Sequence, residues 1–142
     1  MKVKRVNRYY CEYCKKAGCA GGHMRKHEER CTLNPNRICG MCQLLGQNQS
    51  DINRIIKLLP NPEDYRNKTV EYDSFNGLEE AVAKILPKIR EETGNCPACI
   101  MAVFRQGKIH VPTVKGFNFS DECKAIWADI NEQNRQDNYY HY

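Results

Sequence analysis

Cysteine and histidine residues are concentrated near the start of the chain, between Cys11 and Cys42. This stretch holds six of the nine cysteines and two of the four histidines. Four of its metal-ligating residues are separated by two, twelve and three residues: Cys11, Cys14, His27 and Cys31. A tight turn brings the first two sulfurs to one ion, and positions four apart share one face of a helix. The spacing predicts a tetrahedral zinc site, which would stabilise a module too small to build an adequate core.

Residues 9–31 resemble a C2H2-type zinc finger in its Cys-Cys-His-Cys variant. The aromatic Tyr9 and the apolar Met24 match the positions that form the small core of that family. The resemblance implies a ββα fold, with a helix that we expect over residues 22–30. It also implies that the base-reading positions of the family fall on three residues of this chain: Ala20, His23 and Lys26.

The sequence departs from this family where a large apolar residue usually stands, because that position is Gly18. Residues 9–42 also resemble small uncharacterised zinc-finger proteins of bacteria and their phages. That second resemblance implies a bacterial or phage cytoplasm and no assigned activity.

A second histidine leaves the ligand set of the finger open. His23 precedes His27 by four residues, so an alternative set consists of the first two cysteines with both histidines. The twelve-residue spacing to His27 is the commoner one, and it gives Cys31 a role, so we favour the set that ends in Cys31. Cys19 is expected to be a loop residue beside the site.

Two further pairs with the C-x2-C spacing occur later in the chain: Cys39 with Cys42, and Cys96 with Cys99. The absence of a signal peptide predicts a cytoplasmic setting, where thiols stay reduced and bind metal in preference to forming disulfides. The two pairs are therefore most economically joined in one four-cysteine zinc site. Together with the finger, this predicts two structural Zn²⁺ ions.

The sequence favours none of three enzymatic interpretations of these motifs. A thioredoxin-like pair at Cys96 and Cys99 would need a strand-helix-strand pattern around it. The deaminase signature has a proline before its first cysteine, where this chain has Asn95. A metal-dependent nuclease needs clustered polar ligands, whereas His110 stands alone. We therefore expect a protein that is not an enzyme.

The rest of the chain predicts a mostly α protein (small α+β), with helices over 52–59, 78–93 and 120–130 and another starting at Pro97. Pro87 predicts a kink or break in the second of these, and Ser120 is expected to cap the last. We also expect a short strand near residues 108–111. The fold would consist of three parts: a basic finger over 1–33, a helical domain clamped by four cysteines over 34–130, and a disordered tail over 131–142.

Charge is unevenly distributed along the chain. Residues 1–31 carry nine Lys or Arg against three Glu, a net charge of +6, whereas the whole chain has a net charge of +5. A small basic module is typical of nucleic-acid contact, with DNA favoured over RNA here. The expected contact residues lie in the N-terminal arm and the finger helix: Lys4, Arg5, Arg8, His23, Arg25 and Lys26.

A protein-protein interaction module is the alternative function, since isolated fingers also serve as docking surfaces. No apolar run approaches the ~18 residues that a membrane span needs, so we expect no membrane partner. The sequence does not determine the oligomeric state.

Overall fold

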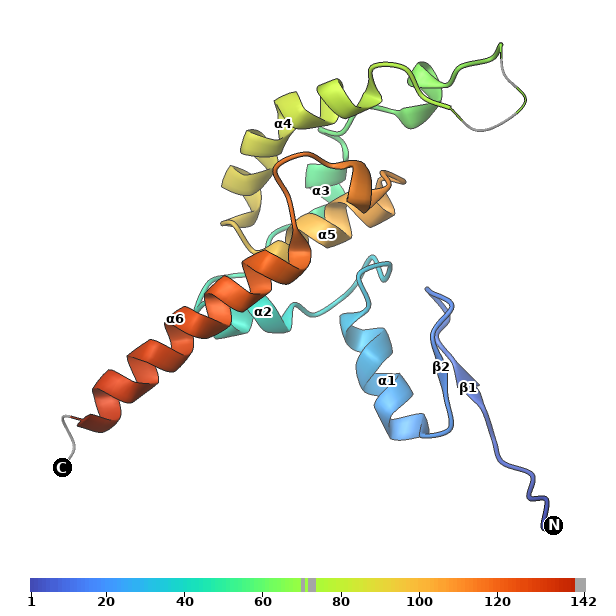
Figure 1. The fold of residues 1–142 in the computed structure, drawn as a ribbon, viewed down its shortest axis with the longest axis vertical. Helices are drawn as coiled ribbons and strands as arrows, with labels where there is room; N and C mark the ends of the chain where they lie inside the picture. The colour runs from blue at the N-terminus through green and yellow to red at the C-terminus, as the bar shows by residue number, and fades with distance from the viewer. Residues whose placement is uncertain (70, 72–73, 140–142) are drawn as a thin grey trace.

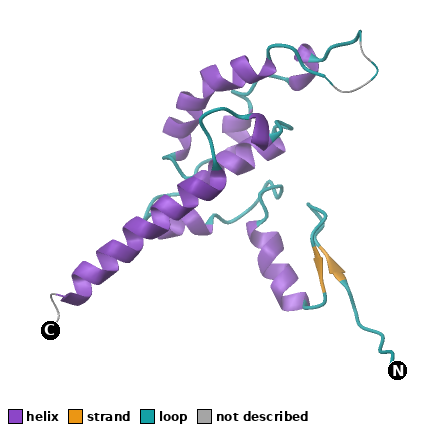
Figure 2. Ribbon diagram, viewed as in Figure 1, coloured by secondary structure: helices purple, strands orange, loops and turns teal. Residues whose placement is uncertain are grey.

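The computed structural model describes residues 1–69, 71 and 74–139. These residues form a two-stranded sheet, six α-helices and two short 3-10 helices (Figures 1 and 2). In chain order the elements are β1 (Tyr9–Tyr10), β2 (Ala17–Gly18), α1 (Gly21–Arg30), α2 (Gly40–Leu44), α3 (Ile52–Ile56), η1 (Pro62–Tyr65), α4 (Leu78–Thr93), α5 (Pro97–Gln106), η2 (Val111–Thr113) and α6 (Phe119–Tyr139). No helix within the described ranges is both long enough and apolar enough to cross a membrane.

The N-terminal module has the ββα order that the resemblance implies. Its strands are antiparallel, with Tyr9 opposite Gly18, and α1 packs against both. Met24 is buried with two of the cysteines, whereas Tyr9 remains 41% exposed. The ring of Tyr9 lies over Gly21, where an added Cβ would stand 3.2 Å from its Cζ atom. Glycine at this position therefore permits the close approach of strand and helix.

The second core is built around α5, which contacts α3, α4, α6 and η2. Pro97 occupies the first turn of α5, as predicted. Proline is favoured there because the backbone N–H that it lacks would have no acceptor within the helix. The helix buries most of its length against its neighbours, and Phe104 packs against Phe117 with 6.0 Å between ring centroids. Helix α5 contributes several fully buried residues to this core: Pro97, Ile100, Ala102, Val103 and Phe104.

Helix α4 continues through Pro87 without the break that the sequence analysis allowed. Leu86 and Ile89 are buried on either side of the exposed proline, so packing holds both halves of the helix against the core. The helix ends at Gly94, whose φ of 60° is left-handed. This turn leads directly into the cysteine pair that starts α5.

Helix α6 differs from the sequence analysis in its cap and in its length. Its first turn is capped by Asn118, whose Oδ1 accepts the N–H of Asp121 at 3.0 Å, so Ser120 is not the cap. Phe119 at the start of α6 is partly buried against the core, whereas Trp127 further along the helix is 46% exposed. Figure 1 shows the helix extending away from the other elements.

The predicted disorder after residue 130 is also wrong as far as Tyr139, because α6 continues to that residue. Contacts of Glu132 with Arg135 and Gln136, at i+3 and i+4, support this polar part of the helix. Residues 140–142 lie outside the described part of the chain. The strand expected at 108–111 does not form, and η2 follows α5 instead.

The finger is fixed to the helical core by hydrogen bonds around residues 32–38. Gln106 of α5 donates to the carbonyls of Thr32 and Asn34, at 2.9 and 3.2 Å. Asn34 donates in turn to the carbonyl of Glu28 at 2.8 Å, within the last turns of α1. The segment that leaves the finger is therefore held from both sides.

Candidate metal centres

The first candidate centre lies between the turn after β1 and the end of α1. The ligand atoms of Cys11, Cys14, His27 and Cys31 all lie within 4.8 Å of one another. The Sγ atom of Cys14 is 3.2 Å from Nε2 of His27. His23 is exposed on α1 and is not part of this cluster, so Cys31 completes the set.

Backbone N–H groups surround the sulfurs of this turn. Tyr13 donates to the Sγ atom of Cys11 and Lys16 to that of Cys14, each at 3.4 Å. Burial opposes ionisation of Cys11, but the N–H groups of Tyr13 and Cys14 outweigh it and lower the pKa of this thiol. Burial instead raises the pKa of Cys31. The turn is thus arranged to hold a thiolate, the form that binds metal.

The second candidate centre joins residues that are far apart in the sequence. Its four sulfurs also lie within 4.8 Å of one another, and all four residues are buried: Cys39, Cys42, Cys96 and Cys99. Cys39 is 3.5 Å from Cys96, and Cys42 is 3.5 Å from Cys99. Each pair opens a helix, since Cys39 precedes α2 and Cys96 precedes α5. The positive end of a helix dipole favours thiolates at such positions.

Two glutamines hold the loop that carries Cys39 and Cys42. Gln47 donates to the Sγ atom of Cys42 at 3.6 Å and to the carbonyl of Thr93 at 3.1 Å. Gln49 accepts the N–H of Cys39 at 2.5 Å and donates to the carbonyl of Arg37 at 2.6 Å. Such outer contacts orient metal ligands and tune their affinity.

Arg37 provides the test of whether a metal fits the four-cysteine centre. The residue is only 5% exposed, its Nε atom has no hydrogen-bond partner, and its Nη1 atom lies 3.8 Å from the sulfur of Cys99. No ion pair between described residues involves it. A buried guanidinium beside four neutral thiols would lack a counter-charge. Four thiolates around a divalent ion carry a net charge of −2, which supplies one.

Ionisation within this cluster is already uneven. Hydrogen bonds from Cys96 and Cys99, with a contribution from the charge of Arg37, lower the pKa of the Cys39 thiol. Hydrogen bonds with Cys39 and Cys96, together with burial, raise the pKa of the Cys99 thiol. The surroundings of Cys39 therefore favour its thiolate form, the form that binds metal. The donor set fits a metal that prefers sulfur ligands.

The remaining cysteines lie outside both centres. Cys19 is exposed and Cys123 is half-buried, and none of the nine cysteines forms a disulfide. Burial raises the pKa of the Cys123 thiol.

The predicted nucleic-acid contacts lie on two exposed parts of the finger module. Three of them are in the arm before β1 (Lys4, Arg5 and Arg8), and three are on α1 (His23, Arg25 and Lys26). The guanidinium of Arg8 lies 5.9 Å from the centre of the Tyr10 ring. All nine Lys and Arg residues between 1 and 31 are exposed, and none forms an ion pair with another described residue.

Comparison with known families, with curated proteins and with solved structures finds no match to this chain. The resemblance to a zinc finger therefore rests on the ligand spacing and the local fold of residues 9–31. Sequence reasoning did not identify Arg37, Gln47 or Gln49 as parts of the second centre. The one available signal was that these residues are close in sequence to Cys39 and Cys42. Closeness in sequence does not reveal which side chains point toward the sulfurs.

Proposed function

We propose that both centres hold Zn²⁺ in a structural role. Three thiolates with one imidazole, and four thiolates, are the donor sets of closed tetrahedral zinc sites. Each cluster already provides four protein ligands, which leaves no coordination position for a substrate. A zinc ion without an open coordination position cannot activate water. We therefore propose that both ions are structural and that the protein is not an enzyme.

We further propose that the protein binds nucleic acid through its basic finger. The observation that carries this proposal concerns its cations: all nine Lys and Arg in residues 1–31 are exposed, and none forms an ion pair with a residue that the structure describes. Of the thirteen Lys and Arg in the rest of the chain, these six form ion pairs with carboxylates of described residues: Arg54, Arg66, Lys88, Arg90, Lys115 and Arg135. Uncompensated positive charge on one module attracts a polyanion.

Phosphate contacts would dominate this binding. The base-reading position Ala20 offers only a methyl group, and a single finger reads about three base pairs. Contacts to the backbone position a protein on nucleic acid without reading its sequence. We therefore expect binding that weakens steeply with salt and discriminates little between sequences.

Fluorescence anisotropy with labelled random DNA, at low and at physiological salt, tests the proposal. The double variant Arg25→Glu and Lys26→Glu should lose most of its affinity and show a shallower salt dependence. The matched control is Lys84→Glu with Lys124→Glu, which changes the net charge equally on exposed positions of α4 and α6. Equal affinity of both double variants would contradict a contact through α1, and no binding by the zinc-loaded protein at low salt would contradict the function itself.

The apolar face of α6 favours a second candidate function, that of a protein-interaction module. Trp127 is 46% exposed, and Ile126 and Ile130 lie on the same side of the helix. A stoichiometric protein partner that is retained after nuclease treatment, and lost with Trp127→Ala, would favour this function.

A further inference from the structure

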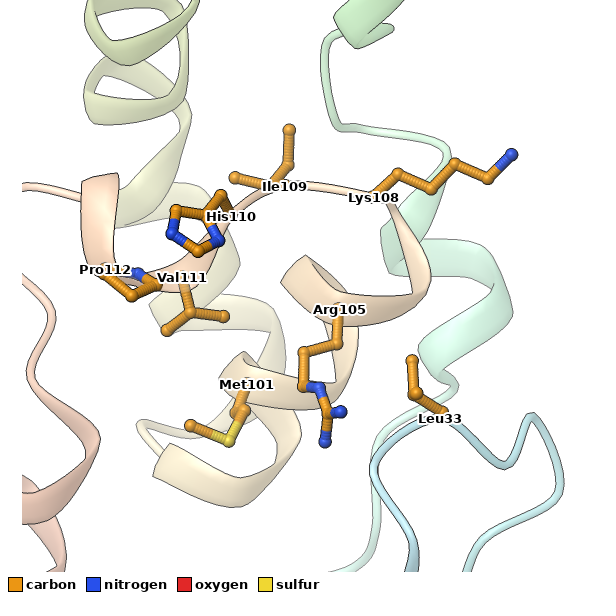
Figure 3. Close-up of a pocket in the computed structure, with 8 residues that line it drawn as sticks. All are labelled: Leu33, Met101, Arg105, Lys108, Ile109, His110, Val111 and Pro112. Carbon is orange, nitrogen blue, oxygen red and sulfur yellow. The ribbon is translucent and has the colours of Figure 1, made fainter. Parts of the chain in front are cut away.

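Two adjoining hollows lie between the finger and the helical domain, and we call them together the interdomain cleft. The larger has a volume of about 570 Å³ and lies beside α5 and the chain that follows it (Figure 3). The smaller, of about 400 Å³, reaches Tyr13 in the metal-binding turn of the finger. Leu33, Arg105 and Lys108 line both hollows, so the two lie side by side.

The lining of the cleft combines positive charge with an apolar wall. Arg105 and Lys108 are exposed there, together with the imidazole of His110. None of the described residues that line either hollow is an Asp or a Glu. Neither Arg105 nor Lys108 forms an ion pair with a described residue. An anionic ligand would therefore meet no carboxylate in the lining of the cleft, although the charge of Lys108 also acts on the exposed Glu63 outside it.

The apolar wall requires a ligand that also has an apolar surface. Figure 3 shows Met101 and Arg105 extending from α5, with Val111 and Pro112 near Met101. At the other end of the cleft, Tyr13 is 39% exposed. A polyanion with flat apolar faces at intervals matches this combination, and unpaired nucleobases on a phosphate backbone have those properties. The bases of a duplex are stacked and cannot offer their faces.

We infer that the interdomain cleft binds a single-stranded segment of nucleic acid. A phosphate contacts Arg105 and Lys108, and an unstacked base lies against Met101 and Val111. The inference rests on the proposed function, because Tyr13, in the metal-binding turn of the basic finger, also lines the cleft. It goes beyond that function by naming single-stranded nucleic acid as the ligand and the helical domain as part of the binding surface.

Lys108 is the most suitable residue for a variant. Its φ of 61° is left-handed, which asparagine tolerates better than most residues, so Lys108→Asn removes the charge without added backbone strain. Lys84→Gln removes one exposed charge from α4 and is the matched control. Arg105 is unsuitable, because its Nη1 atom also donates to Oγ1 of Thr32 at 2.5 Å.

Anisotropy with single-stranded and double-stranded DNA gives the first result. We expect Lys108→Asn to bind single strands about fivefold more weakly, since an exposed ion pair contributes up to about 1 kcal/mol. The slope of affinity against salt should fall by about 0.7 for the lost phosphate contact. Duplex binding should be unchanged. Equal losses for Lys108→Asn and Lys84→Gln would overturn the inference.

Methyl NMR on the zinc-loaded wild-type protein separates this inference from the proposed function. On addition of single-stranded DNA, the methyl signals of Met101 and Val111 should shift, while those of the buried Val82 should not. Shifts confined to the finger would overturn the cleft and leave the proposed function intact. No shift anywhere would contradict both. Shifts of Met101 and Val111 with an acidic peptide, but not with DNA, would overturn the inference in favour of protein docking.

Discussion

Replacing Arg37 by methionine should weaken metal binding at the four-cysteine centre by 10- to 100-fold, the usual effect of losing an outer contact. Its Nη1 atom lies 3.8 Å from the sulfur of Cys99. With an effective dielectric of ~20, the attraction to one thiolate at this distance is ~4 kcal/mol. Burying the guanidinium costs several kcal/mol, which offsets much of that attraction. The expected net loss, about 1.4–2.7 kcal/mol, corresponds to that range of affinities.

Competition with a chromophoric chelator measures the two metal affinities of the protein. Substitution with Co²⁺ identifies the centre that is affected, because four sulfur ligands and three sulfurs with one nitrogen give different spectra. The control Arg54→Met removes an arginine whose own side chain is 65% exposed and lies 2.6 Å from Glu92. This control should change neither affinity appreciably. An unchanged affinity in Arg37→Met would refute the argument that the guanidinium balances the charge of the thiolates.

Three further predictions follow from the two centres and their surroundings. Cys31→Ser should retain one zinc by native mass spectrometry and Cys19→Ser should retain two; the opposite result would contradict the ligand set. Gly94→Ala should destabilise the fold by more than about 1 kcal/mol in urea unfolding, because φ is positive and the new Cβ would lie 2.8 Å from Oε1 of Gln47; an unchanged midpoint would argue against this packing. Burial raises the pKa of the Cys123 thiol, so less of it is thiolate near pH 8, and iodoacetamide should modify it more slowly than the exposed Cys19; equal rates would contradict this.

The parts of the fold that could be predicted are those set by short-range spacing. The spacing of four residues predicted that His27 and Cys31 point to the same side, and the structure places His27 in α1, Cys31 directly after it and both in one cluster. The position of Pro97 in the first turn of its helix is likewise a local preference. The meeting of the two distant cysteine pairs was predicted from ligand chemistry instead, because two C-x2-C pairs together supply the four thiolates of one zinc site.

The parts that could not be predicted depend on tertiary packing. Arg37 is buried because α5 brings Cys99 beside it from 62 positions away, which a pattern of neighbouring residues does not encode. The apolar spacing around Trp127 indicates a helix face but not whether anything covers it. Asn118 and Ser120 are both good capping residues, and the choice between them depends on how the preceding loop approaches the helix.

X-ray absorption spectroscopy on zinc-loaded protein, with the metal content measured on the same sample, tests the account most directly. Two closed centres predict two zinc ions per chain. One centre has four cysteine ligands, and the other has three cysteines and one histidine. The predicted average per zinc is therefore three and a half sulfurs, at about 2.3 Å, and one half nitrogen. A single zinc, or an oxygen ligand from water, would mean that a centre is absent or open and would contradict the account of a structural, non-enzymatic protein.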